Sequence, residues 1–345
     1  MSTQQPGENI VLFGGFKVDV SQFNLNDRSS NVAGVKIPCV IFIILVVLTV
    51  ALRTFARAKY VGHIFADDVL IISAAAFTVA LASTCIAATR HGLGQHVWLL
   101  PMPTLFETIK SCILYLYVCQ ILYTFAIALT KIAIISSYLR FIQDRSFHMA
   151  MYATSVFIAG LWLIYLGVFV TIFQCRPLSG AWNFTINRKC IDYINYLYAS
   201  SAVNVITDIV LCVLPLPHFW RLNMPLKQRI ILCVLLAGGA SACVVGIVRI
   251  GYLHHLRVLD TTYRSVPCLI LSLGECSLGI ISVSIPALRP IAPRVFPPTI
   301  PRSSSSSSRP QTWHVRLTII SSIQNRAHLE SESKQDLSMS ESSGS

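Results

Sequence analysis

Four ionisable side chains fall within stretches of this sequence that are apolar enough to cross a membrane. They are Lys131, Asp208, Arg249 and Glu275. A charge at the centre of a bilayer costs ~2.5–3.5 kcal/mol on insertion scales, so charges found there mark ion pairs, ligand sites or proton pathways. These four residues are therefore the first candidates for function.

Lys131 and Asp208 are expected at similar depths in the membrane. Counting the helical rise from the nearer span ends separates their depths by roughly 6 Å, which long side chains can bridge. We therefore predict an ion pair between Lys131 and Asp208. The more ordinary alternative is that Lys131 extends its ammonium group to nearby lipid head groups, and the sequence allows both.

Asn204 and Glu275 extend this polar set. Asn204 stands four residues before Asp208, so both lie on one helix face, which should look toward other helices rather than lipid. Glu275 is expected in the outer half of the last span. It pairs with Arg249 if Arg249 bends inward; otherwise Glu275 is an uncharged carboxyl group bonded to a backbone carbonyl.

A short hydrophilic segment carries features of an oxidising compartment. Asn183-Phe184-Thr185 is a glycosylation sequon, and Cys175 and Cys190 flank it. We predict N-glycosylation at Asn183 and a Cys175–Cys190 disulfide on the outer side of the membrane. The alternative is a chance sequon between two reduced cysteines.

The composition explains where these residues must sit. Of 345 residues 54% are apolar and 12% are charged, against about 25% charged in an ordinary globular domain, and the mean hydropathy is +0.63. So few charges cannot coat a soluble protein, which predicts a membrane protein. The net charge is +12, and the basic residues stand between apolar runs, where they suit anionic lipid head groups. The expected partner is therefore the lipid bilayer and not a nucleic acid.

About 20 apolar residues are needed for a helix to cross the ~30 Å hydrocarbon core. Seven stretches meet or approach that length, which predicts an all-α, polytopic membrane protein with a bundle of seven transmembrane helices. We place the spans at residues 37–52, 69–89, 112–136, 150–173, 194–217, 230–250 and 266–286. Asp67 and Asp68 begin the second span, where they suit the positive end of a helix and can attract Arg53 or Arg57.

The distribution of Lys and Arg sets the expected orientation. The alternating loops carry eight basic residues on each side, but the carboxyl-terminal tail adds seven to one side and the amino-terminal segment only three to the other. The positive-inside rule then places the amino terminus outside or in a lumen and the carboxyl terminus in the cytoplasm. The membrane itself is the plasma membrane or an endomembrane.

Three regions follow from this count. Residues 1–36 are polar, have no signal peptide, and form the outer amino-terminal segment. Residues 37–290 form the seven-span domain. Residues 291–345 are rich in Pro and Ser and are expected to be a disordered cytoplasmic tail.

Between about Arg53 and Pro290 the sequence carries an ordered series of motifs. They are Arg53 and Arg57, Asp67-Asp68, Gly92-Leu93-Gly94-Gln95-His96, Lys131 before Tyr138-Leu139-Arg140-Phe141, Phe173-Gln174-Cys175-Arg176-Pro177 with Trp182 and Cys190, Asn204 with Asp208, Leu214-Pro215-Leu216-Pro217 with Trp220, Gly238, Arg249, Glu275, and Pro286-Ala287-Leu288-Arg289-Pro290. In this order they resemble the fungal rhodopsin-like domain family of seven-span membrane proteins. One departure is Leu271-Ser272-Leu273-Gly274 before Glu275, where the family usually has a tryptophan.

The resemblance implies a receptor-like fold, with a heterotrimeric G protein and a small ligand as partners. Some relatives are discussed as G-protein-coupled receptors, and others are encoded among secondary-metabolite genes. A retinal linkage is not expected, because a Schiff base needs a lysine amine and the seventh span has none.

We expect a receptor or sensor, with a transporter or accessory protein of secondary-metabolite handling as the alternative. An enzyme is not expected, because the sequence shows no recognisable nucleophile, metal motif or phosphate loop. For the same reason no cofactor and no metal site are expected.

Overall fold

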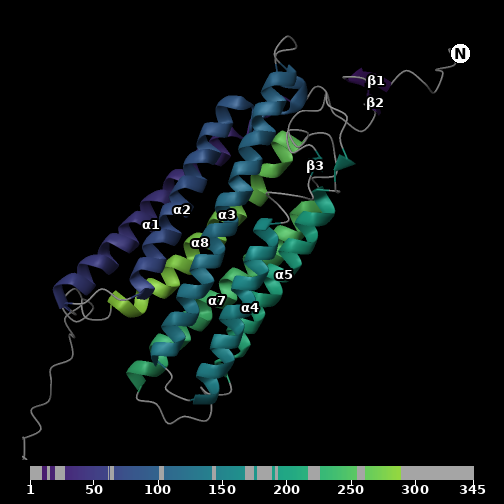
Figure 1. The fold of residues 1–345 in the computed structure, drawn as a ribbon. Coiled ribbons are helices and arrows are strands. Elements are labelled where there is room, and N and C mark those ends of the chain that lie inside the picture. The colour runs from purple at the N-terminus through teal and green to yellow at the C-terminus, as the bar shows by residue number, and fades with distance from the viewer. Residues whose placement is uncertain are drawn as a thin grey trace, which may run out of the picture. The chain divides into compact units, whose positions relative to one another are not determined.

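The computed structural model describes residues 10–13, 16–19, 28–60, 62, 66–100, 105–141, 145–167, 175–176, 189–190, 193–216, 226–254 and 261–288. All of them belong to the first of two units, Met1–Val295 and Phe296–Ser345. Within this part, seven helices are long and apolar enough to cross a membrane. They are α1 (Val32–Tyr60), α2 (Ala66–Ala88), α3 (Leu105–Phe141), α4 (Arg145–Gly167), α5 (Tyr193–Val213), α7 (Leu226–Leu253) and α8 (Thr261–Leu288) (Figure 1). The predicted all-α, seven-span fold class is confirmed.

Most helices are longer than the spans predicted from hydropathy. α1 begins at Val32 rather than 37, and α3 covers Leu105–Phe141 rather than 112–136. The reason is that helical hydrogen bonding continues into the polar flanks, where long charged side chains reach the membrane surface. α4 begins at Arg145 rather than 150 and is described as far as Gly167; the predicted end of the fourth span at 173 lies outside the described residues.

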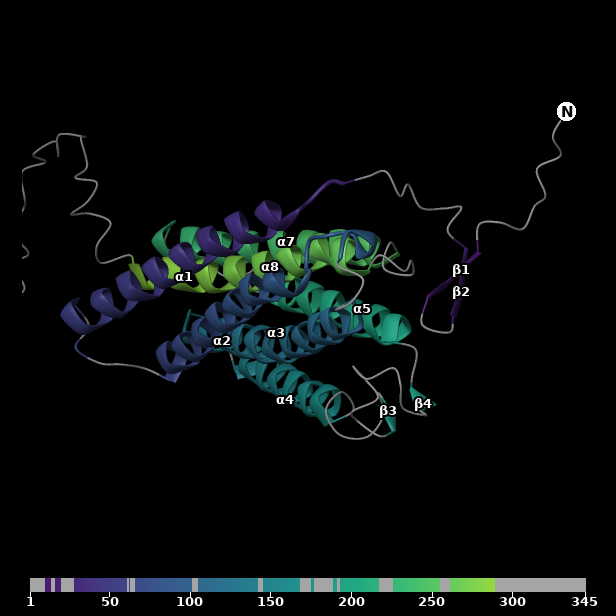
Figure 2. The ribbon, with the colours of Figure 1, turned by 90° about the horizontal axis from the view of Figure 1, so that it is seen from above.

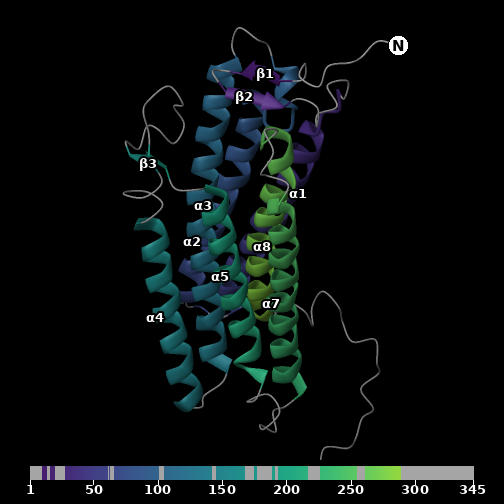
Figure 3. The same cartoon turned by 90° about the vertical axis from the view of Figure 1, so that its right-hand side faces the viewer.

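Viewed from the side, with the helices running across the picture, the bundle has two layers (Figure 2). α1, α8 and α7 make one layer, and α2, α3 and α5 make the other, with α4 against the outer side of α3 (Figure 2). α8 packs on α1, α2, α3 and α7, and most of its length is buried. The side view shows α5 and α7 next to each other and α4 at the margin (Figure 3). We call the end that holds the starts of α1 and α8 the outer end, following the predicted orientation, and the opposite end the inner end.

Small residues let these helices approach closely. A Cβ added at Gly238 of α7 would overlap the side chain of Ser282 on α8, and one at Gly279 of α8 would lie 2.6 Å from Thr130 Cγ2 on α3. Interfaces of this kind, built on small residues, are usual where lipid supplies no hydrophobic drive. Gly238 therefore lies where α7 meets α8, whereas a Cβ at the neighbouring Gly239 would lie 2.7 Å from Cys212 Sγ of α5.

A turn at the outer end joins three helices. Gly92 and Gly94 have φ of +88° and +87°, a conformation that favours glycine. The Gly94 amide donates to Thr262 O at 3.0 Å, and Gly94 O accepts from Asn31 N at 2.8 Å. His96 stacks on Tyr263 with ring centroids 4.0 Å apart. This turn after α2 thereby holds the starts of α1 and α8.

Two short antiparallel ladders lie outside the helices. β1 (Ile10–Phe13) pairs with β2 (Phe16–Asp19) in the amino-terminal segment, and β3 (Cys175–Arg176) pairs with β4 (Lys189–Cys190) between α4 and α5. Neither ladder was predicted from the sequence, because each is too short to show a periodic pattern.

Candidate functional site

Lys131 of α3 and Asp208 of α5 form an ion pair inside the bundle. Lys131 Nζ lies 2.9 Å from Asp208 Oδ1, and the two side chains are 4% and 8% exposed. The same ammonium group donates to Asn204 Oδ1 at 2.7 Å and to Thr207 Oγ1 at 2.5 Å. The structure thus holds Lys131 within the protein rather than extended to lipid head groups.

Glu275 of α8 is fully buried and bonded to side chains from two other helices. Its carboxylate accepts from Tyr123 OH at 3.0 Å and from the side-chain amide of Asn204. Arg249 Nη1 lies 3.6 Å from Glu275 Oε2. A bond from Glu275 to a backbone carbonyl, the other reading of the sequence, is not what the structure shows.

Arg249 of α7 bends inward, as a pair with Glu275 requires. Its hydrogen bonds go to two hydroxyl groups, Ser272 Oγ at 3.2 Å and Ser201 Oγ at 3.1 Å. Its guanidinium carbon lies 4.8 Å from the ring centroid of Tyr123. Arg249 thus ties α7 to α3, α5 and α8 through neutral groups as well as through Glu275.

We call these residues the core polar network: Tyr123, Lys131, Asn204, Asp208, Arg249 and Glu275. Five of them were singled out from the sequence, and the structure brings all five together. Tyr123 was missed, although it precedes Lys131 by about two helical turns and so lies near the same face of α3. The two cations balance the two carboxylates, which keeps the formal charge of the network at zero within the hydrocarbon region.

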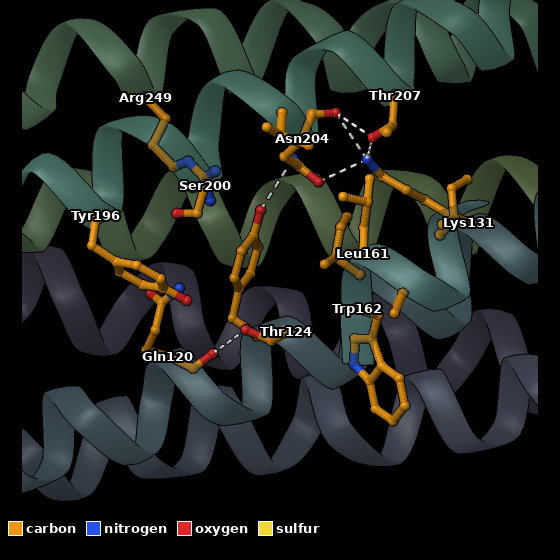
Figure 4. Close-up of a pocket in the computed structure, with 15 residues that line it drawn as sticks. Gln120, Thr124, Lys131, Leu161, Trp162, Tyr196, Ser200, Asn204, Thr207 and Arg249 are labelled. Atoms are coloured by element: carbon orange, nitrogen blue, oxygen red, sulfur yellow. Dashed lines mark hydrogen bonds between the residues drawn. The ribbon is translucent and has the colours of Figure 1, made fainter. Parts of the chain in front are cut away.

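A cavity of about 70 Å³ adjoins the network. We call it the core cavity; its walls come from α3, α4, α5 and α7, and its polar and aromatic lining includes Gln120, Tyr123, Lys131, Trp162, Tyr196 and Asn204. Asn204 lies between Thr207 and Lys131 on one side and Ser200 and Arg249 on the other, with Trp162 on the α4 side (Figure 4). The arrangement can therefore present donors, acceptors and an aromatic face to one small molecule.

A second cluster of charged residues lies at the inner end, and we call it the end cluster: the buried Arg53, Asp67 and Asp68, the half-buried Arg57 and the exposed Arg140. Arg53 Nη2 is 2.6 Å from Asp67 Oδ2, Arg53 Nε is 2.9 Å from Asp68 Oδ1, and Arg53 Nη1 donates to Val283 O of α8 at 2.7 Å. The carboxylates attract both Arg53 and Arg57, as the sequence allowed. The link to α8 was not foreseen, because a backbone acceptor leaves no mark in the sequence.

The segment between α4 and α5 is described only in part. Cys175 and Cys190 are directly opposite each other in the register of β3 and β4. Antiparallel partners lie roughly 4.5–5.5 Å apart at Cα, within the range that disulfides span. Asn183 lies outside the described residues. The Cys175–Cys190 disulfide and the Asn183 glycan stay predictions.

The sequence is similar to several fungal proteins. Over 284 residues, 79% of this chain, the sequence is 27% identical to the polyenoic acids biosynthesis gene cluster protein Ba17b of Metarhizium anisopliae, of which it covers 77%. It is 27% identical over 59% of its length to a SAT4 family membrane protein of Emericella nidulans, and spans about half of that protein. It is 24% identical over 77% of its length to the receptor GIN3 of Arthrobotrys oligospora, covering 65% of it.

Residues 52–294 match the family described as the fungal rhodopsin domain, which is well over half of the chain. This match agrees with the motif series between Arg53 and Pro290 and with the seven apolar helices. The chain is therefore a multi-pass membrane protein that belongs to the fungal rhodopsin domain family.

Proposed function

We propose that this protein is a receptor that binds a small molecule in the core cavity. The observation that carries the proposal is the position of this cavity against the Lys131–Asp208 pair, between α3, α4, α5 and α7. A ligand shifts a conformational equilibrium only if it binds the two states differently. A group that contacts Lys131 or Asn204 competes with Asp208 and Glu275, so binding changes the contacts between α3, α5 and α8.

The end cluster offers a way to pass that change to the inner end. α3 and α8 carry residues of the core polar network and also contribute Arg140 and Val283 O to the end cluster. A relative shift of α3 and α8 therefore alters the contacts of Arg53, Asp67 and Asp68. With the carboxyl terminus in the cytoplasm, this end faces the cytoplasm, where a heterotrimeric G protein is the proposed partner.

A second candidate is a transporter or accessory protein of metabolite handling. The ionisable residues inside the bundle suit a solute pathway as well as a sensor. The relative Ba17b, named for a polyenoic acid gene cluster, supports this candidate, whereas the receptor GIN3 supports the first.

A ligand screen separates the two candidates. The full-length protein is expressed in a reporter cell that carries fungal G proteins and is exposed to a panel of fungal metabolites. A receptor gives a response that Trp162→Ala abolishes at unchanged surface level, because Trp162 lines the core cavity. Phe157→Ala on the exposed side of α4 is the matched control and keeps the response.

The transporter candidate predicts solute flux and no reporter response. Metabolites of the panel then cross proteoliposome membranes against a gradient in the presence of the protein. Flux of a metabolite without any reporter response contradicts the receptor proposal.

A further inference from the structure

A second cavity of about 70 Å³ lies closer to the outer end, between α3, α5, α7 and α8. We call it the outer cavity. Its apolar walls come from leucines such as Leu197 and Leu269, and its polar lining is Gln120, Ser201, Arg249, Ser265 and Ser272.

Gln120 and Arg249 line both the outer cavity and the core cavity. The two spaces therefore meet at these side chains, one from α3 and one from α7. Tyr196 and Ser200 of α5 border the core cavity, and Leu197 and Ser201 of the same helix turn border the outer one. The cavities are thus adjacent, and the Gln120 and Arg249 side chains separate them.

The Gln120 side-chain amide makes no hydrogen bond to any of the described residues; only its backbone carbonyl accepts one, from Thr124 Oγ1 at 2.8 Å. Amides inside membrane bundles ordinarily bond across helices, because lipid offers no partner. A free amide at the junction of two cavities is therefore available to a ligand. It can donate and accept at the same time.

The charges around the junction favour a neutral ligand. Arg249 already faces Glu275 at 3.6 Å, and Lys131 faces Asp208 at 2.9 Å, so the network sums to zero. An added carboxylate or ammonium group would leave a net charge inside the hydrocarbon region. An amide or hydroxyl group adds none and satisfies both functions of the Gln120 amide.

The volume limits the group that fits. An engineered cavity of roughly 150 Å³ holds benzene, so about half of that volume holds a polar group with a few carbon atoms. A larger ligand must occupy both cavities and pass Gln120.

We propose that the outer cavity is the second half of the ligand site, that Gln120 is its specificity-determining residue, and that the ligand is a neutral molecule with an amide or hydroxyl group at this point. The inference rests on the receptor proposal for the core cavity. The test of the outer cavity measures binding alone, so the inference about Gln120 can fail while the receptor proposal still stands.

Cys268 lines the outer cavity and serves as the reporter. The full-length protein in lipid nanodiscs is alkylated with iodoacetamide, and labelling of Cys268 is followed by peptide mass spectrometry. The fully buried Cys276 of the same helix must stay unlabelled while the protein is folded. Butyramide is the neutral probe, and butyrate and butylammonium are the charged ones.

Butyramide at ten times its dissociation constant is expected to slow Cys268 alkylation roughly tenfold, as simple occupancy dictates, while the charged probes have no effect. Gln120→Leu removes the slowing, and Val118→Leu on the exposed side of α3 keeps it. Equal protection by butyrate, protection that survives Gln120→Leu with Cys276 still unlabelled, or no protection by butyramide in the wild type overturns the proposal.

Discussion

Lys131 and Asp208 each depend on the other for burial. Both side chains are less than one tenth exposed, so either one left alone would be an uncompensated charge within the bundle. Breaking such a pair from one side costs far more than removing both partners, because the remaining charge keeps its desolvation penalty. This asymmetry allows the pair to be tested.

Asp208→Asn is expected to destabilise the protein by about 3–5 kcal/mol, measured by unfolding in detergent micelles. The double variant Lys131→Met with Asp208→Asn should recover most of that loss. The control is Glu107→Gln, which breaks the largely exposed pair with Lys110 and should cost about 0–1 kcal/mol. Equal effects of Asp208→Asn and Glu107→Gln would contradict the buried pair.

The residues of this network could be predicted from sequence where a charge or an amide stands inside an apolar run. Tyr123 was indicated only by its helical spacing from Lys131. The hydroxyl partners of Arg249, Ser201 and Ser272, could not be predicted. Hydroxyl groups in transmembrane helices usually bond to their own backbone, as Ser272 also does to Cys268 O at 2.8 Å. Such residues give no sign in the sequence that they also contact a neighbouring helix.

At the scale of elements, the contact of α7 with α8 depends on the absence of a side chain at Gly238. Gly251 on the same helix has open space where its Cβ would stand. The two glycines therefore form a matched pair.

Gly238→Ala is expected to lower stability by about 1–3 kcal/mol, because the new methyl group overlaps Ser282 and forces α7 and α8 apart. Gly251→Ala should leave stability unchanged or raise it by up to about 1 kcal/mol, since alanine restricts the unfolded chain. Thermal unfolding of the two variants, measured side by side, compares their stabilities. A Gly238→Ala protein as stable as the Gly251→Ala protein would mean that the helices do not meet at this position.

Arg53 joins three helices through one guanidinium group. Arg53→Lys should destabilise by about 1.5–3 kcal/mol, because one ammonium group cannot serve Asp67, Asp68 and Val283 O together. Arg57→Lys should cost less, because the contacts of Arg57 with the same carboxylates are longer, 3.4 and 3.5 Å. The same unfolding assay compares the stability losses of the two variants. A larger loss for Arg57→Lys than for Arg53→Lys would contradict the role given to Arg53.

The elements themselves were well predicted because hydrocarbon thickness fixes the length of an apolar helix. Their ends were not, since helices continue into polar residues, as α1 does to Tyr60. Their neighbours could not be predicted either: helices apolar on most sides carry little directional signal, and the central position of α8 came from packing rather than from pattern.

For the whole molecule, the predicted orientation places the segment between α4 and α5 outside the cytoplasm. A non-reducing peptide map of the full-length protein from eukaryotic cells should then link the peptides of Cys175 and Cys190, whose backbones are paired in β3 and β4. The same map should show a glycan on Asn183, and Asn183→Gln should remove it. Free thiols at both cysteines together with an unmodified Asn183 would contradict this orientation.

The central claim is that a small molecule binds beside the core polar network. The most direct measurement is a cryo-electron microscopy map of the full-length protein with the metabolite that the reporter screen identifies. We expect ligand density in the core cavity, in contact with Lys131, Asn204 or Trp162 and extending past Gln120. Density at the lipid-facing surface, with the core cavity empty and the Lys131–Asp208 pair unchanged, would contradict this claim.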